Sequence, residues 1–143
     1  MAITVNINRQ TRLVAYVDVT YADLTSGTSA NAIHLPAGAM LLGGFVDITT
    51  AFSSSSSDVL DIGDTVASTP DDDKYSSSQI TASSTGLTAL TGTTATDSRI
   101  PAGGAWITAT WTGAGTAATS GAFRLQVEYV VDDRVTEYHA YRG

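Results

Sequence analysis

The sequence predicts an all-β protein, a jelly-roll or Greek-key β-sandwich of about eight strands with an extended N-terminal arm. Three observations lead to this fold class. Helix-forming residues are scarce, because Thr, Ser, Gly, Val and Ala dominate the 143 residues and Lys74 is the single lysine. Apolar and polar residues alternate with a period of two in several short segments. Turns rich in Gly, Pro and Ser separate these segments, and no stretch of helical length shows an amphipathic period.

The length indicates one domain with one core. We expect an N-terminal arm at 1–12, a β-sandwich domain at 13–134 and a C-terminal tail at 135–143. The chain has no cysteine, so neither a disulfide nor a thiolate metal site can stabilise it. Stability must therefore come from the sheet core and from contacts with partner subunits.

The arm alternates apolar and polar residues at Ile3, Val5 and Ile7, and then carries Arg9 and Arg12. An unpaired strand edge is a template for strand addition. Such a terminal strand either pairs with its own sheet or reaches a neighbouring subunit, and the sequence leaves both alternatives open.

The first strand of the domain is expected at 13–21, with its odd-numbered residues on one face. A short strand at 32–35 ends in the turn Pro36-Ala37-Gly38. Residues 40–64 are expected to be two strands and their connection, with a bulge or bend at Gly43-Gly44. In the second of these strands Leu60 and Ile62 alternate with Asp61, which predicts a half-buried strand.

The segment 63–78 is the most polar of the chain and is expected to be a long exposed loop. Short strands are expected at 79–82 and 87–92. An apolar-Pro-Ala-Gly corner recurs at 100–103 and precedes a strand at 105–112. The last strand is expected at 122–131, with Phe123, Leu125 and Val127 on one face. Residues 113–118 formally match a dinucleotide-binding motif, but no helix follows, which favours a hairpin loop.

The net charge of −7 and the sequence pI near 4.4 disfavour binding to nucleic acid and to anionic membranes. The first residues lack the basic and apolar regions of a signal peptide, and no run approaches ~20 apolar residues. We expect a protein that is made and used without crossing a membrane.

Catalytic and cofactor sites receive little support from the sequence. No Gly-x-Ser-x-Gly motif occurs, and the two histidines, His34 and His139, are too few for a cupin-type metal site. We therefore predict neither an enzyme nor a bound cofactor. Aspartate oxygens suit calcium, and the weak candidates for such a site are Asp61, Asp64, Asp71 and Asp73. A solvated acidic loop is the simpler interpretation. Trp106 and Trp111 could stack on sugars, although core packing is expected for at least one of them.

Three groups of segments resemble small virion proteins of tailed bacteriophages, the capsid decoration or cement proteins. They are Leu35-Pro36-Ala37-Gly38-Ala39 with the following Gly43-Gly44-Phe45-Val46, Asp58 to Asp64, and Trp111 to Ala117 with Val127-Glu128-Tyr129. The resemblance spans roughly 21–134, and its motifs are turns and strands rather than a catalytic signature.

The resemblance implies a jelly-roll domain that binds the outer capsid surface as a homotrimer, near local threefold points between major capsid proteins. It would be made in the host cytoplasm and would reside in the virion. The residues that suit contact with a shell are Ile3, Val5, Ile7, Arg9, Arg12, Tyr138, Tyr141 and Arg142. Two alternatives stay open: the arm completes its own sheet and the tail is frayed, or the protein is an adhesion module of a fibre or spike that binds host glycans.

Overall fold

The computed structural model describes residues 11–54, 57–67, 69–76, 78–92 and 99–131. These residues form eight β-strands and one short 3₁₀-helix, which confirms the all-β class. The strands are β1 (Leu13–Thr20), β2 (Thr28–Leu35), β3 (Ala39–Thr50), β4 (Asp58–Asp64), β5 (Ile80–Thr81), β6 (Gly86–Ala89), β7 (Ala105–Gly113) and β8 (Ala122–Val131). The helix, η1, spans Tyr21–Asp23. In the described residues no helix is long and apolar enough to cross a membrane.

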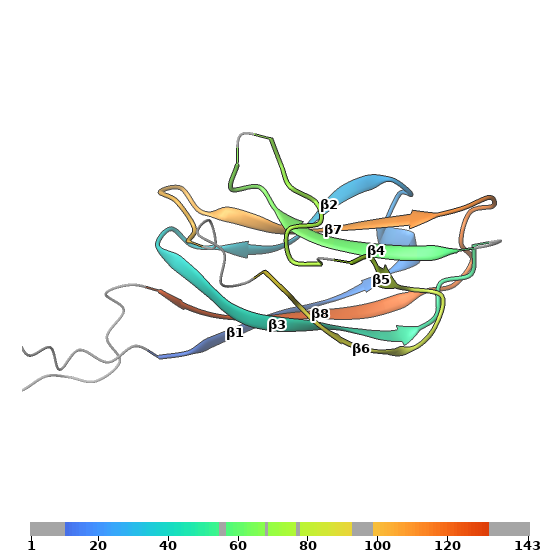
Figure 1. The fold of residues 1–143 in the computed structure, drawn as a ribbon, viewed down its shortest axis with the longest axis horizontal. Coiled ribbons are helices and arrows are strands. Elements are labelled where there is room, and N and C mark those ends of the chain that lie inside the picture. The colour runs from blue at the N-terminus through green and yellow to red at the C-terminus, as the bar shows by residue number, and fades with distance from the viewer. Residues whose placement is uncertain (1–10, 55–56, 68, 77, 93–98, 132–143) are drawn as a thin grey trace, which may run out of the picture.

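The strands form two four-stranded antiparallel sheets that face each other (Figure 1). The first sheet has the order β1-β8-β3-β6 and the second has the order β2-β7-β4-β5. The chain therefore changes sheet at every connection except β4 to β5. Strand β1 pairs with β8, β2 with β7, β3 with β6 and β4 with β5, as if one long antiparallel ribbon had been wrapped around a core. This wrapping is the double Greek key of a jelly roll, as expected.

Alternation places the apolar residues between the sheets. In β8, Phe123, Leu125 and Val127 are at most 1% exposed, while Arg124 and Gln126 on the other face are in contact with solvent. Strand β1 follows the same pattern, as the sequence predicts. At one end of the core Phe52 stacks on Trp111 with 5.6 Å between ring centroids. Trp111 is 4% exposed, and its indole N–H donates to Asp58 at 3.0 Å. The inner faces of both sheets thus supply one continuous core.

The two apolar-Pro-Ala-Gly corners lie side by side. The N–H of Gly38 donates to the carbonyl of Ile100 at 3.0 Å, and the N–H of Ile100 donates to the carbonyl of Ala39 at 2.7 Å. Gly38 has φ +77°, a conformation that glycine adopts without strain. The repeated motif therefore marks two turns that pair at one end of the sandwich.

The bulge expected at Gly43-Gly44 is confirmed, since the register between β3 and β8 shifts between Leu41 and Gly43. Gly44 also lies close against β8, because an added Cβ would collide with the carbonyl oxygen of Gln126. A side chain here would force the two central strands apart.

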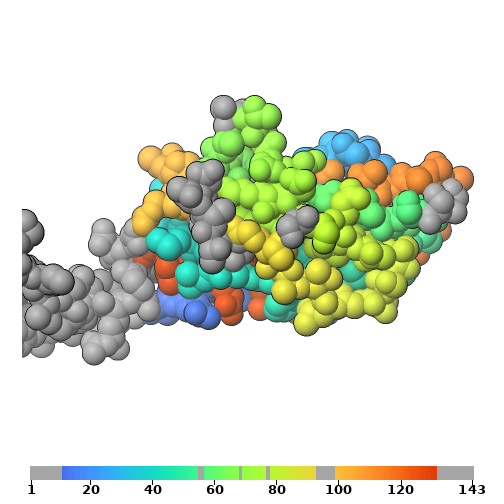
Figure 2. Space-filling view, in the orientation of Figure 1, coloured from blue at the N-terminus to red at the C-terminus, as the bar shows by residue number. Residues whose placement is uncertain are grey.

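Three expectations are wrong: the exposed loop at 63–78, the half-buried strand that precedes it and the hairpin loop at 113–118. The segment 63–78 is not simply an exposed loop, because it folds back on β4 and projects from the outer side of the second sheet (Figure 2). Tyr75 is fully buried, its N–H donates to the carbonyl of Ile62 at 2.8 Å, and the backbone of Asp71 lies directly on Gly63. Consequently β4 is buried on both faces rather than half-buried.

The loop at 114–121 is also different from the expected hairpin. It carries the chain from β7 in the second sheet to β8 in the first sheet, so the strands that it joins do not pair with each other. No helix follows the glycines, which is consistent with rejecting the dinucleotide-binding motif.

Candidate interaction surface

The outward side of the first sheet, which we name the outer face, combines exposed apolar and charged side chains. The strand register aligns these residues in rows across the sheet. One row contains Asp18, Arg124, Asp47 and Leu87, and the next contains Tyr16, Gln126, Phe45 and Ala89. Because the inward residues of these strands fill the core, the outer face is fixed in shape by the packing beneath it.

Most of the exposed large hydrophobic residues gather on this face. Six are exposed in the described part of the chain, and four of them belong to the outer face: Val14 at 53%, Tyr16 at 60%, Leu42 at 37% and Leu87 at 68%. Leu42 lies in the bulge of β3, whereas Val14 and Tyr16 are on the edge strand β1. These residues share one face but extend from β1 at one edge to β6 at the other, and exposed apolar residues on one face are common at interaction sites.

A charged group lies at the centre of the outer face. The guanidinium of Arg124 donates to both carboxylate oxygens of Asp18, at 2.7 and 2.8 Å, and lies 4.5 Å from the ring centroid of Tyr16. This hydrogen bonding lowers the pKa of Asp18 and raises that of Arg124. The fork geometry of the pair orients the Arg124 guanidinium beside the Tyr16 ring.

Both ends of the described chain lie at one end of the sandwich. Leu13 is opposite Tyr129 in the register, and Val131, the last described residue, is opposite Ala39. Arg12 is exposed and donates to Glu128 at 3.1 Å. The other predicted shell contacts, Ile3, Val5, Ile7, Arg9, Tyr138, Tyr141 and Arg142, lie outside the described residues.

Two of the four calcium candidates, Asp61 and Asp64, form hydrogen bonds with other residues of the chain. Asp64 is 1% exposed, accepts hydrogen bonds from the Lys74 ammonium at 2.9 Å and the Val66 N–H at 3.0 Å, and also binds the Tyr75 hydroxyl. Asp61 is 7% exposed and accepts from Ser76 and Gln79. These carboxylates hold the 64–79 segment against β4.

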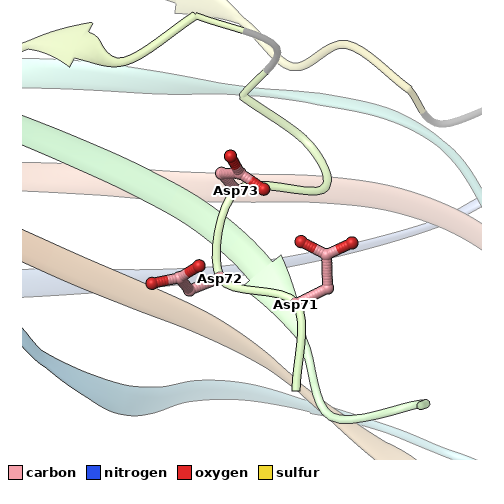
Figure 3. A group of neighbouring side chains, drawn as sticks. All are labelled: Asp71, Asp72 and Asp73. Atoms are coloured by element: carbon pink, nitrogen blue, oxygen red, sulfur yellow. The ribbon is translucent and has the colours of Figure 1, made fainter. Parts of the chain in front are cut away.

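The other two candidates, Asp71 and Asp73, come together with Asp72 in a single turn (Figure 3). One oxygen of each carboxylate lies within 4.8 Å of the others, and all three side chains are exposed. The neighbouring Asp71 raises the pKa of Asp73 above its ordinary value. The structure thus brings Asp71 and Asp73 together in an exposed turn, whereas Asp61 and Asp64 are buried and bonded to protein groups.

The two tryptophans have different environments. Trp111 is in the core, which confirms the expectation for at least one of them. Trp106 is 39% exposed on the outward side of the second sheet, where its ring meets that of His34 edge to face at 4.9 Å between centroids. A platform formed by both tryptophans is therefore excluded, and Trp106 alone remains accessible.

The fold is similar to chains in three bacteriophage capsid structures. The matched chain of the cyanophage Pam1 capsid asymmetric unit is 18% identical, with a TM-score of 0.61 over 92% of this chain and 91% of that chain. The capsid of Ralstonia phage GP4 gives 15% identity and a TM-score of 0.60, over 92% and 90% of the two chains. The matched chain of the acidic stable capsid of Helicobacter pylori bacteriophage KHP30 is 13% identical, with a TM-score of 0.54 over 87% of this chain and 94% of that chain. At these identities the likeness establishes a shared fold. No protein-family model and no curated protein matches the sequence.

Proposed function

We propose that this protein is a virion structural protein that decorates and stabilises the outer surface of a bacteriophage capsid. Its partners are the major capsid protein and two further copies of itself, in a homotrimer at threefold positions. One observation carries the proposal: chains in three phage capsid structures share the jelly roll over 87–92% of this chain and 90–94% of their own length. The counterparts are therefore whole chains of similar size rather than domains of larger proteins.

The outer face and the position of the termini support a role in assembly. An amphipathic face with fixed charges suits a protein surface more than a small substrate. The arm and the tail both begin at the end of the sandwich where Leu13 and Val131 lie, so they can reach the same neighbouring surface. In this proposal the arm, with Ile3, Val5, Ile7, Arg9 and Arg12, and the tail, with Tyr138, Tyr141 and Arg142, hold the protein in the assembly.

Stabilisation would follow from mass action and would require no chemical step. A decoration protein that binds the assembled shell but not dissociated subunits lowers the free energy of the shell by RT ln(1 + [L]/Kd) at each site. At a hundredfold excess over Kd the gain is about 2.7 kcal/mol per site. Repeated over many sites, this gain would oppose the pressure of packaged DNA.

Binding to undecorated shells tests the proposal. Purified protein is mixed with shells that lack it, and co-sedimentation and electron cryomicroscopy then measure the bound amount and its position. We expect saturable binding at threefold positions on the outside, and weaker binding after deletion of residues 2–10. Absence of binding to shells of its own phage would reject the decoration role.

The exposed Trp106 favours one second candidate, an adhesion module for host glycans. A ring that is 39% exposed beside His34 offers a surface on which a sugar can stack. A glycan array with the parent protein and the Trp106→Ala variant tests this function. Loss of a glycan signal in the variant would support adhesion, and a blank array with saturable shell binding would reject it.

A further inference from the structure

The edge of β1 is the least protected strand edge of the sandwich. Of the four edge strands in the described chain, β5 has two residues, β6 has four, and β2 carries a register irregularity between Asn31 and Ile33. Short length and bulges are the usual protections of an edge. Strand β1 has eight residues in regular register with β8, and it contains neither proline nor lysine. It therefore presents an open template for another strand.

Two hydrogen bonds show which backbone groups of β1 point outward. The N–H of Tyr21 donates to the carbonyl of Gly121 at 2.9 Å, which continues the ladder between β1 and β8. In an antiparallel pair the hydrogen-bonded residues alternate, so the even-numbered residues of β1 face away from β8. The N–H of Thr20 does so, because it donates to Asp23 instead. The backbone groups of Val14, Tyr16 and Asp18 accordingly lie along the open edge.

A cleft with a mixed lining lies beside this edge, between β1 and β2. Its volume is about 270 Å³, and its apolar residues Val17, Val19, Leu24, Ala30, Ala32 and Ala109 are joined by Asp18, Asp23 and Asn31. An extended strand with an apolar residue at every second position could bond to β1 and direct those residues toward the cleft.

We propose that residues 3–7 of a second copy of this chain add to the edge of β1, with Ile3, Val5 and Ile7 facing the cleft. The inference rests on the proposed homotrimer and names the contact that holds it together. The ten residues that precede the described chain supply the required alternation. They carry Arg9 and no acidic residue, whereas the edge carries Asp18 and Asp23.

The chain direction favours a second copy over the arm's own sheet. Arg12 directly precedes β1, and its side chain donates to Glu128, which is opposite Val14, so the outward alternation of β1 continues to Arg12. A tight two-residue hairpin directly before β1 needs residues that accept positive φ, and Arg9 to Arg12 contain no Gly, Asn or Asp; the nearest such residue is Asn8, five positions before Leu13. In the proposed arrangement the arm leads away from its own sheet to a second copy. Three such head-to-tail contacts can close into a ring, and they leave the tail for the shell.

The first test measures solution mass by size exclusion with light scattering. We expect about 44 kDa, three times 14.8 kDa, for the full chain and a monomer after deletion of residues 2–10. Tyr16→Pro removes one outward N–H and should also give a monomer, whereas Tyr16→Ala keeps that N–H and should stay trimeric. Leu87→Pro is the matched control, because the N–H of Leu90 bonds to Gly44 and the alternation turns that of Leu87 away from β3. An unchanged trimer after the deletion, or a monomeric full chain, overturns the proposal.

The second test identifies the copy that provides the strand, and it does not depend on a destabilising variant. The chain has no cysteine, so Tyr16→Cys can be combined in turn with Thr4→Cys or Asn6→Cys, the arm positions that face away from the cleft. We expect oxidation to link different chains into covalent oligomers on a denaturing gel. Disulfides within single chains would assign the arm to its own sheet, and no disulfide in either variant would overturn the pairing.

Shell binding distinguishes failure of this inference from failure of the proposed function. If the full chain co-sediments with shells but the deletion leaves its solution mass unchanged, decoration holds and the arm exchange is wrong. If the deletion gives a monomer but the full chain does not bind shells, the arm exchange holds and the decoration role is wrong.

Discussion

Replacing Lys74 by methionine should strongly destabilise the protein. The ammonium of Lys74 is the cation beside Asp64, at 2.9 Å, and the two side chains are 10% and 1% exposed. Methionine retains the apolar length of the side chain but leaves a buried carboxylate without its positive partner. Removing one member of a buried ion pair costs about 3–5 kcal/mol. Since small domains have about 5–15 kcal/mol of stability, this is a large fraction of the total.

The measurement is urea unfolding followed by tryptophan fluorescence, with parent and variant at the same protein concentration. The matched control is Arg12→Met, which breaks the exposed pair with Glu128, where the side chains are 64% and 35% exposed. This control should cost less than about 1 kcal/mol, because solvent screens the pair. If Lys74→Met costs no more than the control at an unchanged m-value, the buried pair does not hold the 64–79 segment in place.

Three further predictions concern the core, the folded-back segment and the acidic turn. Leu125→Ala, at a fully buried position of β8, should cost about 2–5 kcal/mol in the same unfolding assay. Gly63→Ala should lower the free energy of unfolding by about 1–3 kcal/mol, because the added Cβ collides with the backbone of Asp71. The control Gly43→Ala has open space around its Cβ and should lower it by less than about 1 kcal/mol. Equal effects of the two substitutions would contradict the close contact at Gly63. Asp71 raises the pKa of Asp73, so just above pH 3.8 the folded state binds more protons than the unfolded state. The stability of the parent relative to the Asp73→Asn variant should therefore fall as the pH rises through this range. Melting temperatures of parent and variant that change in parallel with pH would contradict the coupling.

The sequence was most informative where one face of a strand meets the core. The strand at 122–131 was predicted with the bounds that the structure has, because five alternating apolar residues and flanking turn residues determine both its type and its face. The Gly43-Gly44 bulge and the paired corners at Gly38 and Ile100 were also signalled, since glycine and proline restrict or permit specific backbone conformations.

The aspartates of β4 were the main failure of sequence reasoning. Asp58, Asp61 and Asp64 look like solvent-facing residues in a polar region, yet all three are buried. Their partners are Trp111, Ser76 and Lys74, which lie 53, 15 and 10 residues away along the chain. No local pattern reveals such pairing, because the hydrogen bonds that make burial of a carboxylate tolerable form only when distant segments meet.

The sequence by itself determined the all-β class, the inward faces of the first and last strands and the positions of the main turns, since these depend on alternation and on backbone preferences within a few residues. The tertiary structure decided which strands pair, that the chain changes sheet at almost every connection, and that the outer face aligns Asp18, Arg124 and Tyr16. It also decided that β1 is an open edge. Strand order and edges are properties of contacts between segments far apart in the chain, and the free energy of those contacts depends on the whole packed core rather than on any one segment.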